Sequence, residues 1–230
     1  GGYFASTRSG LVSAAVTIPL LLLYNLGLLV PGNREMNAAD LLSFAVTNAG
    51  GPKVFLAVNG VLLVSSLILI VVLIRKGLFR PGHWFLLGLE GLMYGLLLGH
   101  GVVWVLGQSH VLAVAGAPQR GILQVLSLSA GAGYWEELVF RLLLVGGPIA
   151  LAGRLATRSP LAARIVTGCL AVTISSFLFS LAHYIGSESF EPYSFWYRTL
   201  SGYVFAAIFL TRGFGVAAYT HFLYDVIVML

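Results

Sequence analysis

The feature that most constrains this chain is a series of long apolar segments that carry almost no charge. Of its 230 residues, 58% are hydrophobic and only 9% are charged, and the mean hydropathy is +0.93. Soluble domains carry roughly 25% charged residues. A chain this apolar cannot hide its hydrophobic side chains inside a water-facing globule. The sequence therefore predicts an integral, multi-pass membrane protein surrounded by a lipid bilayer.

Seven segments are long enough to cross a membrane, which takes about 20 apolar residues per helix. The runs are continuous, whereas the strands of a membrane barrel would alternate over segments of about ten residues. The predicted fold class is therefore all-α, a polytopic helix bundle forming one integral-membrane domain over residues 1–230. The expected spans are about Leu11–Val30, Val54–Ile74, Trp84–Leu106, Ile122–Leu151, Ile165–Ile185, Phe195–Leu210 and Phe214–Leu230.

Two segments are expected to be irregular. The fourth span is too long for one straight helix, and we expect a break near Pro148, where a helical hydrogen bond is missing. The loop Pro31–Pro52 is long enough to hold a short interfacial helix on the membrane surface. Cys169 is the only cysteine and lies in an apolar run, so no intrachain disulfide can form and a buried position is expected.

The distribution of Lys and Arg between the spans predicts the topology. One side of the membrane carries eight basic residues and the other side four. The richer side, which includes the N-terminus, should face the cytoplasm of a bacterial-type cytoplasmic membrane. Basic residues placed in this way are topology signals, so the formal charge of +5 does not indicate a nucleic-acid partner. The richer side has Arg8, Arg75, Lys76, Arg80, Arg154, Arg158, Arg164 and Arg212, and the poorer side has Arg34, Lys53, Arg120 and Arg198.

Three charged residues interrupt the fourth span: Glu136, Glu137 and Arg141. Each would cost roughly 2.5–3.5 kcal/mol at the bilayer centre, so they must face the protein interior. On an α-helix, Glu137 and Arg141 share a face and can form an ion pair, whereas Glu136 points about 100° away from Glu137. Glu136 is then left free to act as a general base. The alternative is an ion-pair cluster that only locks two helices together.

Other polar residues in the apolar spans could join this group. His183 ends the fifth span, and His221 and Asp225 share a face of the seventh. Such a set can polarise one water by hydrogen bonding alone or around a metal. The metal set would be Glu136, His183, His221 and Asp225, with a divalent ion such as zinc, and metal-free catalysis is equally open. Glu90 and His100 lie in the third span without an assigned role, although Glu90 could pair with a loop arginine.

The order of these residues resembles the CPBP family of intramembrane proteases, also called the CAAX-protease and bacteriocin-processing, or Abi, family. Its members include the prenyl-protein endopeptidase called Ras-converting enzyme. The family motifs are EExxxR, FxxxH and HxxxN or HxxxD on separate membrane helices. They correspond here to Glu136-Glu137-x-x-x-Arg141, Phe179-x-x-x-His183 and His221-x-x-x-Asp225. The resemblance covers about Gly131–Val228, within a catalytic core at 122–228.

The resemblance implies roles for individual residues. Glu136 would activate a water, with His183 as its partner, and His221 and Asp225 would stabilise the oxyanion or act as ligands. Glu137 would accompany these catalytic residues and form the structural ion pair with Arg141. Two positions depart from the family pattern. Leu142 stands where many members have glycine, and Asp225 stands where the prenyl-protease branch has asparagine.

We therefore expect an intramembrane endopeptidase that uses Glu-activated water. Its substrate would be a membrane-anchored protein or peptide cleaved near its C-terminal anchor. The positions of His183 and Asp225 suggest access from the side poorer in basic residues, whereas the resemblance to the prenyl proteases implies access from the cytoplasm, and both stay open. Substrate-binding residues are not identified. Two alternatives stay open: a non-catalytic scaffold or chaperone of the same family, and a proton-coupled transporter, which the absence of an inverted repeat disfavours.

Overall fold

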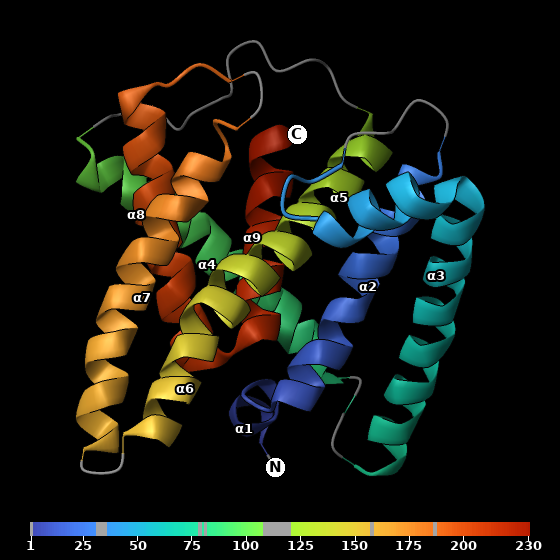
Figure 1. Ribbon diagram of the computed structural model, residues 1–230, viewed down its shortest axis with the longest axis horizontal. Coiled ribbons are helices and arrows are strands. Elements are labelled where there is room, and N and C mark those ends of the chain that lie inside the picture. Colours follow the sequence, from blue (N-terminus) through green and yellow to red (C-terminus); the bar gives the residue numbers. More distant parts are fainter. Residues whose placement is uncertain are drawn as a thin grey trace.

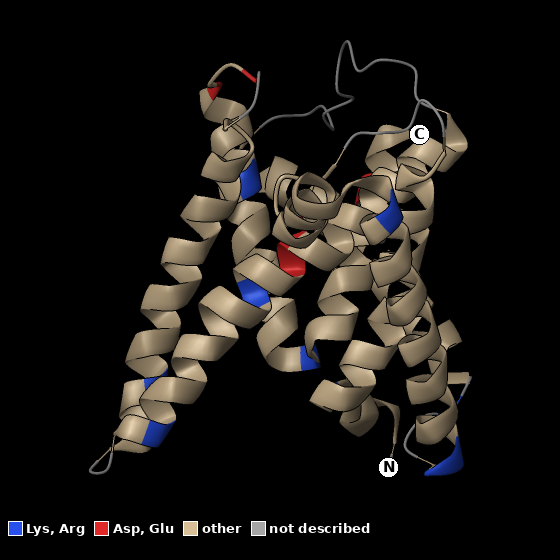
Figure 2. Ribbon diagram, turned by 45° about the vertical axis from the view of Figure 1, so that its right-hand side comes forward, with Lys and Arg blue, Asp and Glu red and all other residues tan. Residues whose placement is uncertain are grey.

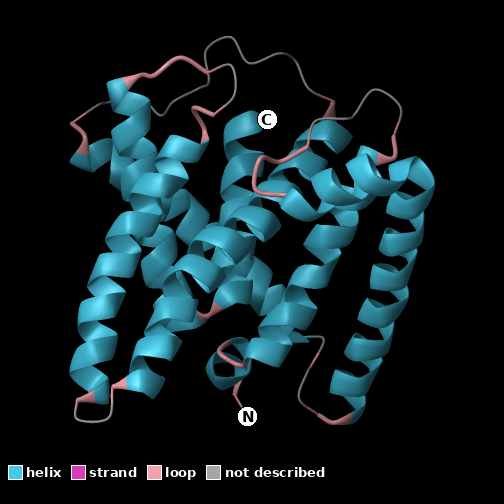
Figure 3. Cartoon of the chain, in the orientation of Figure 1, coloured by secondary structure: helices cyan, strands magenta, loops and turns pink. Residues whose placement is uncertain are grey.

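A computed structural model describes residues 2–30, 36–77, 80, 82–107, 121–156, 159–185 and 188–230. Across these residues the chain is all-helical, with no strand (Figure 3). The elements are α1 (Tyr3–Thr7), α2 (Gly10–Leu28), α3 (Leu41–Arg75), α4 (Gly82–Val105), α5 (Ile122–Gly131), η1 (Ala132–Gly146), α6 (Gly147–Leu155), α7 (Pro160–Ala182), α8 (Pro192–Arg212) and α9 (Phe214–Met229). The predicted all-α class is confirmed.

The predicted spans correspond to helices at nearly the expected positions. Five helical segments within the described residues are long and apolar enough to cross a membrane: α2, α3, α4, the α5–η1–α6 unit and α7. The other two predicted spans are α8, which is less apolar, and α9, whose 16 residues reach about 24 Å. Seven membrane helices therefore fit the architecture, although two of them are weaker spans than the sequence suggested.

The loop before the second span contains the expected short helix. The first part of α3, residues 41–50, turns into the long second part at Gly51, whose φ of 65° and ψ of −169° interrupt the helix. This positive φ favours glycine because it has no Cβ. In Figure 1 the first part of α3 lies across one end of the bundle, whereas the second part runs along its side.

The fourth span contradicts the predicted break. The chain stays helical from Ile122 to Leu155, and both Gly146 and Gly147 keep helical φ and ψ angles. The irregularity lies earlier, in η1, where residues 132–146 form a wider π-helix. π-Helical turns are rare and often occur at functional sites. The helix that carries both glutamates is therefore distorted where the motif lies, and Pro148 does not break it.

The helices form a bundle with α9 inside it. Helix α9 packs against α2, α4, α5, η1 and α8. Figure 1 shows α9 in the middle of the bundle, with other helices on both sides. The start of α2, the end of α3 and the α6–α7 connection lie toward the lower end of this view, and the α8–α9 connection lies higher, in the lower half of the bundle. Lys and Arg mark several of these lower tips in Figure 2. The described part of the basic-rich set thus lies toward one end, while Arg34, Arg120 and Arg158 lie outside the described residues.

The outer surface of the bundle is apolar, as contact with lipid requires. Large hydrophobic side chains are exposed along the outward faces of α3, α4 and α7. Cys169 belongs to this surface, because it is exposed on α7. The expectation that Cys169 is buried was therefore wrong. Its apolar surroundings in the sequence are those of a lipid-facing helix surface, which an apolar sequence pattern cannot distinguish from a buried one.

A second charged cluster ties the N-terminus to the basic end of the bundle. Glu90 on α4 accepts hydrogen bonds from Arg212 at 2.5 and 3.0 Å and from the hydroxyl of Tyr3 at 2.5 Å. The expected pairing of Glu90 with an arginine beside a loop is therefore confirmed, and the partner is Arg212, the last residue of α8. His100 is exposed, and its Nδ1 donates to the carbonyl of Leu96 at 2.8 Å. This hydrogen bond is made within α4 and does not connect His100 to another helix.

One glycine allows η1 to lie directly on α9. A Cβ on Gly133 would lie 2.5 Å from the carbonyl oxygen of Ala218 and 2.9 Å from Cβ of Phe222. We predict that Gly133→Ala separates the two helices and lowers the stability by at least the 1–3 kcal/mol typical of overpacking. The matched control is Gly88→Ala, where no atom lies within 4 Å. Thermal unfolding in detergent should show a lower Tm for Gly133→Ala alone. Equal melting of both variants would contradict this packing.

Candidate active site

The site forms where η1, α7 and α9 meet beside the segment that precedes α3. Glu136 and Glu137 come from η1, His221 and Asp225 from α9, and His183 follows the last residue of α7. Residues Glu137 and His221 are 0% and 4% exposed, and Glu136 is 9% exposed. The structure therefore brings the predicted residues together in a buried region.

His221 is the centre of this group. Its Nδ1 lies 2.8 Å from Oε1 of Glu137, and because a carboxylate can only accept, Nδ1 donates the proton. This bond turns the opposite nitrogen, Nε2, toward the other two carboxylates. Nε2 lies 3.9 Å from Oε2 of Glu136 and 3.8 Å from Oδ2 of Asp225. One imidazole is therefore surrounded by three carboxylate groups.

The two glutamates differ from the helical-wheel expectation. On an α-helix Glu136 would point well away from Glu137, yet both lie beside the same imidazole, at its two nitrogens. The wider π-helix changes the angle between successive side chains, and this brings the neighbouring carboxylates to one partner. Glu137 does lie 3.3 Å from Arg141, but its closer partner is His221. Sequence spacing alone could not show this arrangement.

Arg141 is held by aromatic faces as well as by charge. It is 1% exposed, and its guanidinium carbon lies 4.3 Å from the ring centre of Phe179 and 5.1 Å from that of Phe205. Phe205 also stacks on His221, with centroids 4.4 Å apart and planes 20° apart. Cation–π contacts of this kind stabilise a desolvated cation. Phe179, the first residue of the second motif, thus helps to hold the arginine of the first.

His183 lies at the edge of the site. Its Nδ1 is 2.9 Å from the carbonyl oxygen of Phe179, so Nδ1 donates and a neutral ring leaves Nε2 as an acceptor. The ring also packs edge-on against Phe179, with centroids 5.2 Å apart. The ring of Phe179 also contacts that of His221, with centroids 5.8 Å apart. His183 is partly exposed, whereas His221 is enclosed.

Asn37 is a site residue that the sequence analysis missed. Its Nδ2 donates to Oε1 of Glu136 at 2.6 Å. The amide is oriented by two further bonds: Oδ1 accepts from the backbone N of Ala39 at 2.9 Å, and the backbone N of Asn37 donates to the hydroxyl of Tyr24 at 2.9 Å. Asn37 lies 99 residues before Glu136 in a polar loop, so no spacing pattern could have indicated it.

The two oxygens of Glu136 have different surroundings. Oε1 is bound by Asn37, whereas Oε2 has no hydrogen-bond partner among the described residues. Oε2 faces Nε2 of His221 across 3.9 Å, which is too long for a direct hydrogen bond. A polar separation of this length is one that a water can bridge. The arrangement can therefore offer one free carboxylate oxygen to a water.

The predicted metal set does not form a metal site in this arrangement. Among the residues that the structure describes, no group of three His, Cys, Asp or Glu side chains is placed to hold a metal ion. We therefore derive no catalytic step through a metal.

Exchanging the two groups of the Asn37–Glu136 contact tests this arrangement directly. Asn37→Asp keeps an acceptor for Ala39 but places a second carboxylate against Glu136, and should cost about 2 kcal/mol, or roughly 4–8 °C in Tm. Adding Glu136→Gln restores a donor opposite the new carboxylate and should recover most of the loss. Thermal unfolding of the two single variants and the double variant gives the coupling. Additive losses would show that the two side chains do not meet.

Comparison with protein families agrees with the motif order. The model of a family described as type II CAAX prenyl endopeptidase Rce1-like matches residues 118–227. This segment contains every residue of the three motifs. No curated protein and no solved structure matches the chain.

Proposed function

Because residues 118–227 belong to the Rce1-like family of type II CAAX prenyl endopeptidases, we propose that this protein is an intramembrane endopeptidase in which Glu136 activates the attacking water. The observation that carries the proposal is the asymmetry of the Glu136 carboxylate. One oxygen is fixed by Asn37 and the other is free and faces His221. An oriented carboxylate with one open oxygen, inside an apolar bundle, has the geometry of a general base.

The proposed reaction begins with a water beside Oε2 of Glu136. Glu136 takes one proton of this water as its oxygen attacks the carbonyl carbon of the scissile peptide. His183 accepts the second hydrogen bond of the water through Nε2, since its Nδ1 is engaged with Phe179. The attack forms a tetrahedral intermediate, and Glu136 then delivers its proton to the leaving nitrogen. The products are a carboxylic acid, which keeps the second proton of the water, and an amine, and Glu136 returns to its ionised starting state.

His221 stabilises the oxyanion of that intermediate in our proposal. The bond from Nδ1 to Glu137 points Nε2 at the space between Glu136 and Asp225. A second proton on His221 is compensated by the carboxylates around it, so Nε2 can donate to developing negative charge. Asp225 then contributes charge balance, which an asparagine would not supply. This gives a physical role to the position at which the chain departs from the prenyl-protease pattern.

The position of the site restricts the substrate. Asn37 precedes α3, His183 follows α7, and Asp225 lies in the last third of α9, so the site lies toward the end of the bundle opposite the N-terminus (Figure 1). We propose that the substrate is a membrane-anchored protein or peptide cleaved near its C-terminal anchor. Its scissile bond would enter from the membrane boundary that is poorer in Lys and Arg.

Replacing Glu136 by Gln tests the proposed base. Glu136→Gln keeps the shape of the side chain but cannot accept a proton, and we expect cleavage to fall by about 10²–10⁴-fold. The measurement is proteomics of membrane and secreted fractions, scoring C-termini that appear with the wild type and vanish with the variant. Glu188→Gln is the control, because Glu188 is an exposed carboxylate paired with Arg198. Undiminished cleavage by folded Glu136→Gln would refute the mechanism.

Metal removal gives an independent test of the same chemistry. Because the described His and carboxylate side chains do not form a three-ligand group, we expect chelators to leave the cleavage rate unchanged. The purified protein should also contain much less than one equivalent of zinc. The measurements are elemental analysis and a rate assay before and after chelation. Loss of activity that added zinc restores would replace the proposed mechanism with a metal-assisted one.

A further inference from the structure

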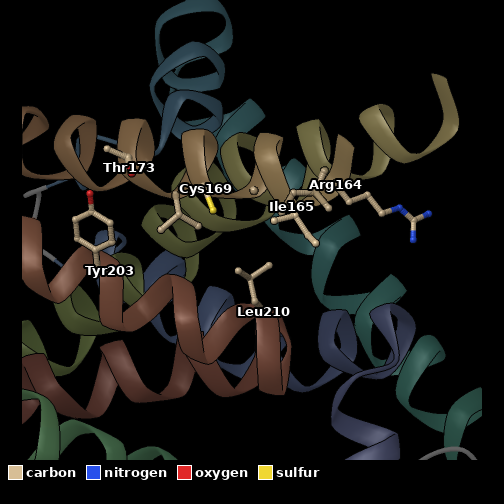
Figure 4. A pocket seen from close by; sticks show the side chains of 9 residues that line it. Arg164, Ile165, Cys169, Thr173, Tyr203 and Leu210 are labelled. Carbon is tan, nitrogen blue, oxygen red and sulfur yellow. The ribbon is translucent and has the colours of Figure 1, made fainter. Parts of the chain in front are cut away.

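A shallow groove lies on the lipid-facing side of the bundle, between α7 and α8 with α6 beneath. Its volume is about 510 Å³, within the range of small-molecule sites. Its lining is almost wholly apolar, with one cation at its end. Figure 4 shows the lining side chains that define this groove: Arg164, Ile165, Cys169, Thr173, Tyr203 and Leu210. The groove is built from residues that the proposed catalytic machinery does not use.

Arg164 occupies one end of the groove and has no protein partner there. Among the described residues it makes no hydrogen bond or ion pair. Its side chain lies against α6 at Gly153, where a Cβ would come within 1.9 Å of Nε of Arg164. In Figure 4 the guanidinium extends beyond the apolar side chains. The sequence therefore leaves space for an arginine that presents its donors at the mouth of an apolar groove.

The length of the groove matches one leaflet of a bilayer. From Arg164 to Thr173 the nine-residue rise along α7 is about 14 Å, close to half of a hydrocarbon core that is about 30 Å thick. Arg164 lies in the first turns of α7, near the α6–α7 connection, at one end of the bundle. A molecule filling the groove would thus have its polar group at the membrane boundary and an apolar chain along α7.

The positive charge near this groove favours a ligand whose polar group is anionic. Residues 142–187 contain three arginines, Arg154, Arg158 and Arg164, and no Asp or Glu. Basic clusters at the end of membrane helices attract anionic headgroups, and a guanidinium binds phosphate oxygens with charge-assisted hydrogen bonds. We propose that an anionic phospholipid binds here, with its phosphate at Arg164 and one acyl chain in the groove. This site is independent of the proposed protease chemistry.

The single cysteine provides the test. Cys169 is the only cysteine of the chain, is exposed and lines the groove. We expect phosphatidylglycerol, added to the protein in an uncharged detergent, to slow maleimide labelling of Cys169 several-fold more than phosphatidylcholine with the same chains. Glycerol phosphate, which has no chains, should give no protection. Equal protection by the two lipids, or protection by glycerol phosphate, would overturn the proposal.

Two arginine variants separate a specific site from general attraction. Arg164→Gln should abolish the preference for phosphatidylglycerol. Arg154→Gln should keep it, since Arg154 lies in the last turn of α6, at the same cationic end, but does not line the groove. Equal loss in both variants would mean that the region attracts anionic lipid only through its net charge, and the groove would not be a site.

A label-free measurement covers the case in which Arg164→Gln folds poorly. Leu210→Trp fills the groove from α8 without changing either arginine, and Leu210 is exposed, so the bundle interior is not disturbed. In native mass spectrometry we expect the wild type to retain one more phosphatidylglycerol molecule than Leu210→Trp. Retention of the same number of lipids by both proteins would contradict binding in the groove.

Discussion

The hydrogen bond between Glu137 and His221 is the contact on which the rest of the site depends. Two polar groups buried in an apolar bundle are costly unless each satisfies the other. Here the bond of 2.8 Å fixes the imidazole, and the imidazole in turn lies between Glu136 and Asp225. Because the two partners come from η1 and α9, the same bond holds the two motif helices in register.

The surrounding helices supply what this bond needs to persist. Gly133 lets η1 approach α9 without a side chain between the two backbones. Phe179 and Phe205 cover the guanidinium of Arg141, and Phe205 also stacks on His221. These aromatic faces exclude water and lipid from the charged groups, and a low-dielectric surrounding strengthens each remaining electrostatic contact. Packing and charge therefore stabilise the same arrangement, although they come from different helices.

The sequence predicted the helical spans and brought the motif residues into one group, because apolar length and ordered motifs are local or linear features. It did not predict three-dimensional details that depend on distant partners. The π-helix overturned the argument that Glu136 points away from Glu137. Pro148 was accommodated without a break, and Cys169 faces outward. Asn37 carried no signal in the sequence, since a single asparagine in a polar loop matches no motif.

The hydrogen bond from Asn37 means that a residue outside the three motifs orients Glu136. In the proposed mechanism the three motifs supply the reactive groups, but the orientation of Glu136 depends on a loop that is anchored by Tyr24 and followed directly by α3. Tyr24 is fully buried, so its hydroxyl ties this loop to the bundle interior, whereas the first part of α3 lies across the end of the bundle (Figure 1). A substrate that enters from that end, as we propose, would pass this segment on its way to Glu136. In the proposed mechanism, the segment that orients the base would therefore also be one that the substrate contacts.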